Sequence, residues 1–127
     1  LTVLELRADL AGAREGFAIT LDPADLAGCS QVLSTSTVLL NHTLDGVLAA
    51  CRSARHIALV GPGAGCLPDG LFARGVTLLG GSWVVDAEAF KQALATGAPW
   101  GGSARKFALT RANYPGWQAL LAVADKP

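Results

Sequence analysis

A glycine-rich stretch after an apolar run is the first feature of this sequence with a chemical use. The stretch Gly61-Pro62-Gly63-Ala64-Gly65 follows the apolar run His56 to Val60. Glycine lets a backbone approach a ligand closely, and the N–H groups at the start of a following helix attract an anion. A dinucleotide-binding fingerprint would need glycine where Cys66 stands, and a Walker loop would need Gly-Lys-Ser/Thr, which is absent. The stretch is therefore either a ligand-binding loop or a tight turn.

Polar side chains upstream are the second candidate. The run Ser34 to Thr37 offers hydroxyls, and Asn41, His42 and Thr43 offer an amide, an imidazole and a further hydroxyl. An imidazole can act as a metal ligand or as a base near neutral pH. The alternative is that these residues cap a helix and form local turns.

Two single residues complete the set. Glu5 ends the first predicted strand, where an acidic residue binds ribose hydroxyls in dinucleotide folds; it could equally pair with Arg7. Cys66 follows the glycine stretch, where a nearby helix start would lower its pKa. The alternative for Cys66 is a buried, apolar cysteine.

Alternating strands and helices must position these residues. The pattern predicts a mainly parallel sheet with right-handed crossovers. Ligands of such sheets bind at the carboxyl ends of the strands, so the polar or glycine-rich segments 34–43, 61–66 and 80–82 should share one rim with Glu5, with Gly80-Gly81 breaking a strand. Strands are expected over 1–6, 31–35, 56–60 and 76–79, with edge strands over 17–21 and 106–109; helices are expected over 44–51, 69–73, 87–96 and 114–124.

Composition narrows the function classes. The 127 residues are 51% hydrophobic and 16% charged with zero net charge, which predicts one globular domain over residues 1–127 and no nucleic-acid partner. No apolar run approaches the length of a membrane span. Three scattered cysteines favour a reducing, cytoplasmic location. The chain begins with Leu1 and contains no methionine, so we expect a fragment of a longer protein.

Several motifs together carry a family resemblance. The run from Thr37 to Leu44 and the segment "LVGPGAGCLPDGLFARGVTLLGGSWVVDAEAF" resemble the putative heavy-metal chelation family, catalogued as a domain of unknown function. The resemblance covers Leu1 to Gly97. It implies a Rossmann-like three-layer domain, here lacking its first strand, that follows an N-terminal domain similar to the small N-terminal domain of enolase. The proposed site of the family is the cleft between the two domains.

Carried onto this chain, the resemblance assigns the cleft to polar and glycine positions near the rim. Gly63-Ala64 stands where the family tends to have hydroxyl residues, which weakens a side-chain ligand role there. The ligand-binding residues that the resemblance implies are Asn41, Thr43, Gly61, Pro62, Gly63, Gly80 and Asp86. The residue types and their positions add Glu5 as a ligand-binding residue and His42 and Cys66 as candidate metal ligands.

Three functions follow as hypotheses. The first is binding of a small anionic ligand or metal chelate, with a role in heavy-metal chelation or metallocofactor handling and a transition metal as the candidate cofactor. The second is an enzyme that uses a nucleotide-type cofactor. The third is a module that docks the missing N-terminal domain or a second subunit as a homodimer. The sequence leaves open whether any reaction is catalysed.

Overall fold

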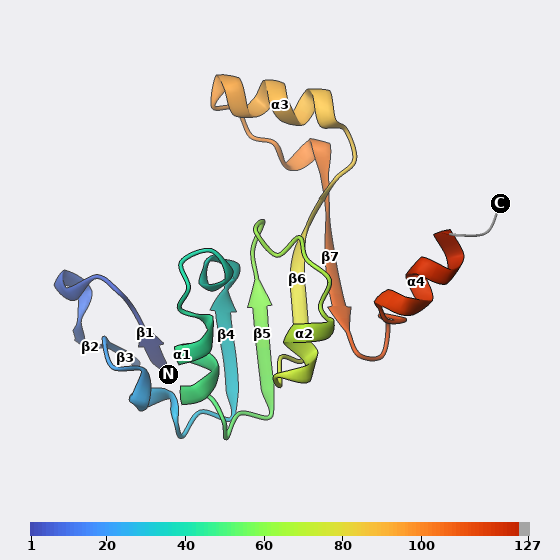
Figure 1. Ribbon diagram of the computed structural model, residues 1–127. Helices are drawn as coiled ribbons and strands as arrows, with labels where there is room; N and C mark the ends of the chain where they lie inside the picture. Colours follow the sequence, from blue (N-terminus) through green and yellow to red (C-terminus); the bar gives the residue numbers. More distant parts are fainter. Residues whose placement is uncertain (125–127) are drawn as a thin grey trace.

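The computed structural model describes residues 1–124 and contains two sheets and four α-helices (Figure 1). None of the helices within this range is both long and apolar enough to cross a membrane. The strands are β1 (Thr2–Leu4), β2 (Gly12–Arg14), β3 (Phe17–Thr20), β4 (Gln31–Thr35), β5 (His56–Val60), β6 (Leu78–Val84) and β7 (Ala104–Thr110). The helices are α1 (Leu44–Ala50), α2 (Asp69–Ala73), α3 (Ala87–Thr96) and α4 (Trp117–Ala124), and four short 3-10 helices, η1 (Ala8–Leu10), η2 (Pro23–Leu26), η3 (Ser36–Leu39) and η4 (Gly101–Ser103), lie between them.

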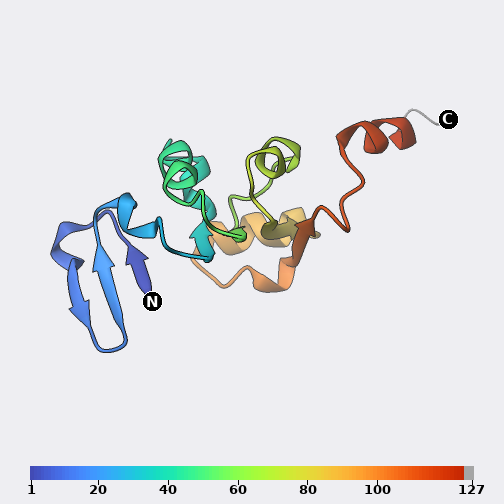
Figure 2. The ribbon, with the colours of Figure 1, turned by 90° about the horizontal axis from the view of Figure 1, so that it is seen from below.

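The larger sheet has the order β4-β5-β6-β7. Strands β4, β5 and β6 are parallel, and β7 runs antiparallel to β6. The apolar run of β5 predicted a buried strand, and Leu59 in it is fully buried, as is its register partner Leu79 of β6. Helices α1 and α2 lie together over one face of this sheet (Figure 2). The mixed α/β class and the mainly parallel sheet are therefore confirmed.

The smaller sheet has the order β1-β3-β2. Strand β1 pairs with β3 in parallel, and β2 and β3 form an antiparallel hairpin. Its turn is Glu15-Gly16, where Gly16 has a φ of 81°, a conformation that glycine adopts at no steric cost. Two expectations are wrong here: β1 does not belong to the larger sheet, and the segment 17–21 forms the centre of a sheet and not an edge.

The predicted strand break at Gly80-Gly81 is also wrong. Strand β6 runs without interruption from Leu78 to Val84, and both glycines keep their register with β7. The reason is a contact across the strands. A Cβ atom built on Gly81 would lie 2.6 Å from Cζ of Phe107, so the Phe107 ring occupies the space of a side chain. A long-range contact thus overrides the weak strand propensity of glycine.

An arm, here defined as residues 82–106, projects beyond the larger sheet (Figure 1). Its base is a two-stranded ribbon, because β5 pairs with β6 only as far as Gly80, whereas β6 and β7 stay paired to Val84. The helix α3 at its tip begins as predicted, with Asp86 accepting a hydrogen bond from the Ala89 N–H at 3.0 Å. None of its residues is buried, so the expected inner face packs only locally, through an edge-to-face contact of Phe90 with Trp100.

The second face of the larger sheet is open. Helices α1 and α2 both lie on the other side (Figure 2). On the open face Leu33 of β4 is 77% exposed and Val60 of β5 is 43% exposed. The second layer of helices expected for a three-layer domain is thus not formed by residues 1–124. Parallel sheets are usually covered on both faces, so the exposure of this face is unusual for a sheet of this kind.

Helix α4 begins at Trp117, three residues later than predicted, and is anchored at its start to α2. The Tyr114 hydroxyl donates a hydrogen bond to Oδ2 of Asp69 at 2.6 Å, and the Trp117 N–H donates to Oδ1 of Asp69 at 3.2 Å. The Tyr114 ring also meets the Phe72 ring edge to face. Burial, followed by the hydrogen bond to Asp69, raises the pKa of Tyr114 to about 12. The same bond holds the pKa of Asp69 below its ordinary value.

This anchor predicts a defined pH window. The Tyr114 contribution to stability is complete below the unfolded pKa of 10.0 and is lost as the pH rises through about 12. The Asp69 contribution is present above its unfolded pKa of 3.8 and is lost as the pH falls through the lower folded value. Because Tyr114 is the only tyrosine, phenolate absorbance reports it alone.

We therefore expect one phenolate transition near pH 12 in the native protein. Asp69→Asn should lower the midpoint while leaving it above the unfolded value, because burial acts on the phenol in both proteins. Asp45→Asn, which removes a carboxylate far from Tyr114 along the chain, is the control and should not move it. A native midpoint at the unfolded value, or one that Asp69→Asn leaves unchanged, would contradict the anchor.

Candidate functional site

A cleft lies between the two sheets. It has a volume of about 770 Å³ and is lined by the whole of β1 and the whole of β4, together with η3, α1 and the segment that joins them. Its apolar wall includes Val3, Leu4, Val32 and Val38. The polar residues that line it are Thr2, Glu5, Gln31, Ser34, Thr35, Thr37, Asn41, His42 and Thr43. An apolar cavity of this size with a few grouped polar residues is typical of a small-molecule site.

The polar part of the cleft follows the carboxyl end of β4. Thr35 ends the strand and caps η3, since its hydroxyl accepts a hydrogen bond from the Thr37 N–H at 3.3 Å. After η3, Oδ1 of Asn41 accepts hydrogen bonds from the Thr43 N–H at 3.2 Å and from the Thr43 hydroxyl at 2.6 Å. Asn41 thus closes a turn that leads into α1, but no side chain caps this helix, so the predicted capping by Asn41 or Thr43 is wrong.

His42 lies inside this turn and has an unusual backbone. Its φ is 60°, and it is the only non-glycine residue of the described chain with a positive φ. The left-handed conformation costs an L-residue roughly 1–2 kcal/mol. Such strain persists only where the surrounding structure imposes it, and it gathers at functional sites. Here the Asn41–Thr43 hydrogen bonds enclose His42 in a turn, and this exposed residue lines the cleft.

Glu5 also lines the cleft, although β1 belongs to the other sheet. Its Oε1 accepts hydrogen bonds from the backbone N–H groups of Leu6 at 2.7 Å and Arg7 at 3.3 Å. The alternative of a pair with the Arg7 side chain is not formed, because that guanidinium binds Asp9. The carboxylate of Glu5 is thus held by its own backbone at the mouth of the cleft.

The glycine-rich loop stands behind the cleft and not in its wall. Gly61 lies against the buried Ser36 of η3, so that a Cβ on Gly61 would be 2.3 Å from the Ser36 Oγ. Gly63 lies beside the same hydroxyl and Leu40. The helix that follows starts only at Asp69, whose carboxylate is bound to Tyr114. The loop therefore sets the position of η3, and the start of α2 carries a negative charge.

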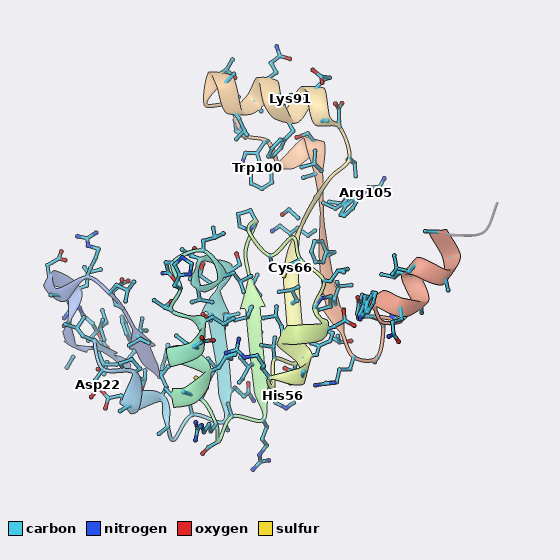
Figure 3. The ribbon with its side chains drawn as sticks, viewed as in Figure 1. Asp22, His56, Cys66, Lys91, Trp100 and Arg105 are labelled. Carbon is cyan, nitrogen blue, oxygen red and sulfur yellow. The ribbon has the colours of Figure 1, made fainter. Side chains whose placement is uncertain are left out.

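The remaining predicted site residues lie apart from the cleft. Pro62 belongs to the same glycine loop, and Gly80 is a buried residue within β6 whose carbonyl accepts a hydrogen bond from the Gly61 N–H at 2.9 Å. Asp86 caps α3 on the arm. Cys66 is exposed, which excludes the buried alternative, and Figure 3 shows it near α2 and β6.

Residues 1–124 do not provide enough side-chain ligands in one place to hold a metal ion by themselves. Within residues 1–124 no three His, Cys, Asp or Glu side chains are grouped closely enough to hold a metal ion. Cys51 is buried under α1, and burial raises the pKa of its thiol, so it stays protonated and packs as an apolar side chain. The cleft itself is lined by one histidine, one glutamate and one free cysteine, namely His42, Glu5 and Cys29.

The hydroxyl run Ser34 to Thr37 was a candidate as a whole, but none of its members was among the predicted ligand-binding residues. Thr35 and Thr37 line the cleft, and Ser36 between them holds the glycine loop. The available signal was the run of four hydroxyl residues that spans the end of β4 and the start of η3. A run alone does not reveal which hydroxyls face a cleft and which face the interior, because that depends on the 3-10 turn that follows the strand.

The protein is therefore an α/β protein with a mainly parallel sheet. A cleft lined in part by polar residues lies beside β4. The chain belongs to the family described as "Putative heavy-metal chelation" (DUF364), whose model matches residues 1–113. No curated protein matches the chain.

Two solved structures of family members with unknown function are similar. One, from Pyrococcus horikoshii, has a TM-score of 0.72 at 22% identity and covers 86% of this chain and 46% of its own. The other, from Desulfitobacterium hafniense, has a TM-score of 0.67 at 27% identity and covers 79% of this chain and 42% of its own. This chain thus matches less than half the length of either relative.

The contact between Gly61 and Ser36 predicts that two glycines of the same loop differ strongly in how much an alanine substitution lowers the stability of the protein. Gly61→Ala should destabilise the protein by about 1–3 kcal/mol, the usual cost of overpacking, because its Cβ would overlap the Ser36 hydroxyl. Gly65→Ala is the matched control, since a Cβ there meets nothing within 4 Å. The measurement is the urea midpoint of unfolding. Adding Ser36→Gly to Gly61→Ala should restore part of the loss, and equal effects at both glycines would contradict this packing.

Proposed function

We propose that the protein binds a metal ion already held by a small organic chelator, in the cleft between β1 and β4. The chelate is cargo, and His42 supplies one ligand to its metal. The observation that carries the proposal is the left-handed His42, which is held in a closed turn that lines the cleft. Imidazole nitrogen suits copper, nickel and zinc.

The missing protein ligands support a chelate rather than a bare ion. The cleft has one histidine, one glutamate and one free cysteine, and no three such residues within 1–124 are grouped closely enough to hold an ion, so the metal must bring most of its own donors. The apolar wall formed by Val3, Leu4 and Val32 suits the organic part of such a ligand. Hydroxyls of Thr35, Thr37 and Thr43 and the Asn41 amide group suit its anionic or polar rim.

Position within the fold adds a second support. The polar side chains follow the carboxyl end of β4, and open α/β sheets bind ligands outside the carboxyl ends of their strands. We infer on this basis that the sheet binds its ligand as Rossmann-like sheets do, at the carboxyl ends of its strands. The cleft lies at the edge of β4 that pairs with no strand of the larger sheet. The family description, heavy-metal chelation, agrees with metal-bearing cargo.

The test compares the two histidines of the chain. The probe is Cu²⁺ held by iminodiacetate, which leaves coordination positions free, and binding is followed by calorimetry and by the electron paramagnetic resonance signal of copper. His42→Ala should weaken binding at least tenfold, about 1.4 kcal/mol. His56→Ala is the matched control, since His56 is also exposed but lies at the start of β5, as Figure 3 shows. It should leave binding unchanged.

Several results would overturn the proposal. Equal losses from both histidine variants would mean adventitious coordination to surface imidazoles. Binding of NAD or AMP that His42→Ala does not affect would favour the nucleotide-cofactor alternative in its place. Asn41→Ala opens the turn that fixes His42 and should cause an intermediate loss; no change would remove the role assigned to the left-handed conformation.

A further inference from the structure

We propose that the arm carries a second binding site, which takes a small aromatic carboxylate. The aromatic ring of the ligand packs on the indole of Trp100, and its carboxylate accepts hydrogen bonds from the Lys106 ammonium group and the Ser82 hydroxyl. No residue of this site lines the cleft between β1 and β4. The proposal therefore does not depend on what that cleft binds.

A pocket of about 310 Å³ lies on the arm, close to its junction with the larger sheet. Its size is at the lower end of the roughly 300–1,000 Å³ that is typical of small-molecule sites. The residues that line it are Ser82, Pro99, Trp100, Gly101, Ala104 and Lys106. Figure 3 shows Trp100 between α3 and the upper end of the sheet. The pocket thus lies beyond the carboxyl ends of the parallel strands, where open α/β sheets bind ligands.

The ribbon presents Ser82 and Lys106 on one face. They are register partners in β6 and β7, so their side chains lie side by side. The neighbouring pair Gly81–Phe107 faces the glycine loop, since a Cβ on Gly81 would lie 3.4 Å from the Ala64 Cβ. Side chains alternate between the two faces of a strand. Ser82 and Lys106 therefore lie on the open face, away from the layer of α1 and α2 that Figure 2 shows.

Local contacts hold the Trp100 indole in place. Phe90 of α3 meets it edge to face, with the ring centroids 5.4 Å apart. The Trp100 carbonyl accepts hydrogen bonds from the Ser103 hydroxyl at 2.7 Å and from the Ser103 N–H at 3.0 Å. The buried Ser103 is tied to the start of α3, because its own carbonyl accepts hydrogen bonds from the N–H groups of Val85 and Asp86. This half-buried tryptophan lies outside the hydrophobic core, so its ring is available to a planar ligand.

The charge of Lys106 favours an anion. None of the three ion pairs found within residues 1–124 includes Lys106, and no residue that lines the pocket is acidic. An ammonium group and a hydroxyl can both donate hydrogen bonds to a carboxylate. These donors come from the ribbon, whereas Pro99 and Trp100 supply an apolar wall from the segment before η4. The combination fits an acidic group attached to an aromatic ring better than a bare anion or a neutral hydrocarbon.

The experiment uses naphthalene-2-carboxylate as the probe, and binding to the full chain is measured by calorimetry and ligand-observed NMR. Its carboxamide analogue keeps the rings and removes the charge. The wild type should bind the acid roughly fivefold to tenfold more tightly than the amide, between the effect of an exposed ion pair and that of a hydrogen bond to a charged group. Lys106→Gln should remove this preference and leave amide binding unchanged. Lys91→Gln is the matched control, because Lys91 is an exposed lysine of the arm outside the pocket.

Trp100→Leu tests the ring contact and should weaken binding of both the acid and the amide by roughly fivefold. Trp83→Leu is its matched control, since Trp83 is 70% exposed on the same ribbon but is paired with Arg105 on the other face. It should change neither affinity. Trp100→Phe should keep part of the affinity, because a phenyl ring preserves both the contact with Phe90 and an aromatic surface.

Several results would overturn this second site. The wild type might show no saturable binding of the acid, or Lys106→Gln might leave acid binding unchanged or weaken acid and amide alike. Equal losses from Lys91→Gln and Lys106→Gln, or from Trp83→Leu and Trp100→Leu, would mean non-specific attachment to exposed side chains. His42→Ala should not affect the acid, and a loss there would place the acid in the cleft instead.

Discussion

The structure depends on the burial of β5 between two parallel neighbours and beneath two helices. Leu59 and Leu79 have no exposed surface, and Ile57 beside them is nearly buried. Each such side chain contributes roughly 1.5–3 kcal/mol when removed from water. This packing fixes where β4 and β5 end, and so fixes the loops that leave them. Both the cleft and the glycine loop inherit their positions from it.

Local signals allowed much of the fold to be predicted. The run His56 to Val60 predicted β5, the spacing of Leu44, Val47, Leu48 and Cys51 predicted α1, and Asp86 with Gly97 marked the ends of α3. The errors have a common physical origin. Strand β6 passes through Gly81 because a ring from β7 fills the missing side-chain space. Strand β1 pairs in parallel with β3 of the β2–β3 hairpin, and these strands are too short to show a period.

Local signals in the sequence also allowed part of the candidate site to be predicted. Asn41, His42, Thr43 and Glu5 all line one cleft, as residue types and strand ends had indicated. The glycine loop attracted notice for its spacing, yet its glycines serve a close contact with Ser36. Asp86 is a helix cap on the arm. Residue types alone do not separate a glycine that admits a ligand from one that admits a neighbouring hydroxyl.

The arm has a dynamic consequence. Helix α3 contributes no side chain to the core, and its principal packing contact, between Phe90 and Trp100, stays within the arm. Its opening therefore costs only local interactions, whereas exposure of the Leu59 amide requires the whole sheet to separate. The chain thus contains two units of unequal free energy of opening, and hydrogen exchange in α3 is governed by the lower one.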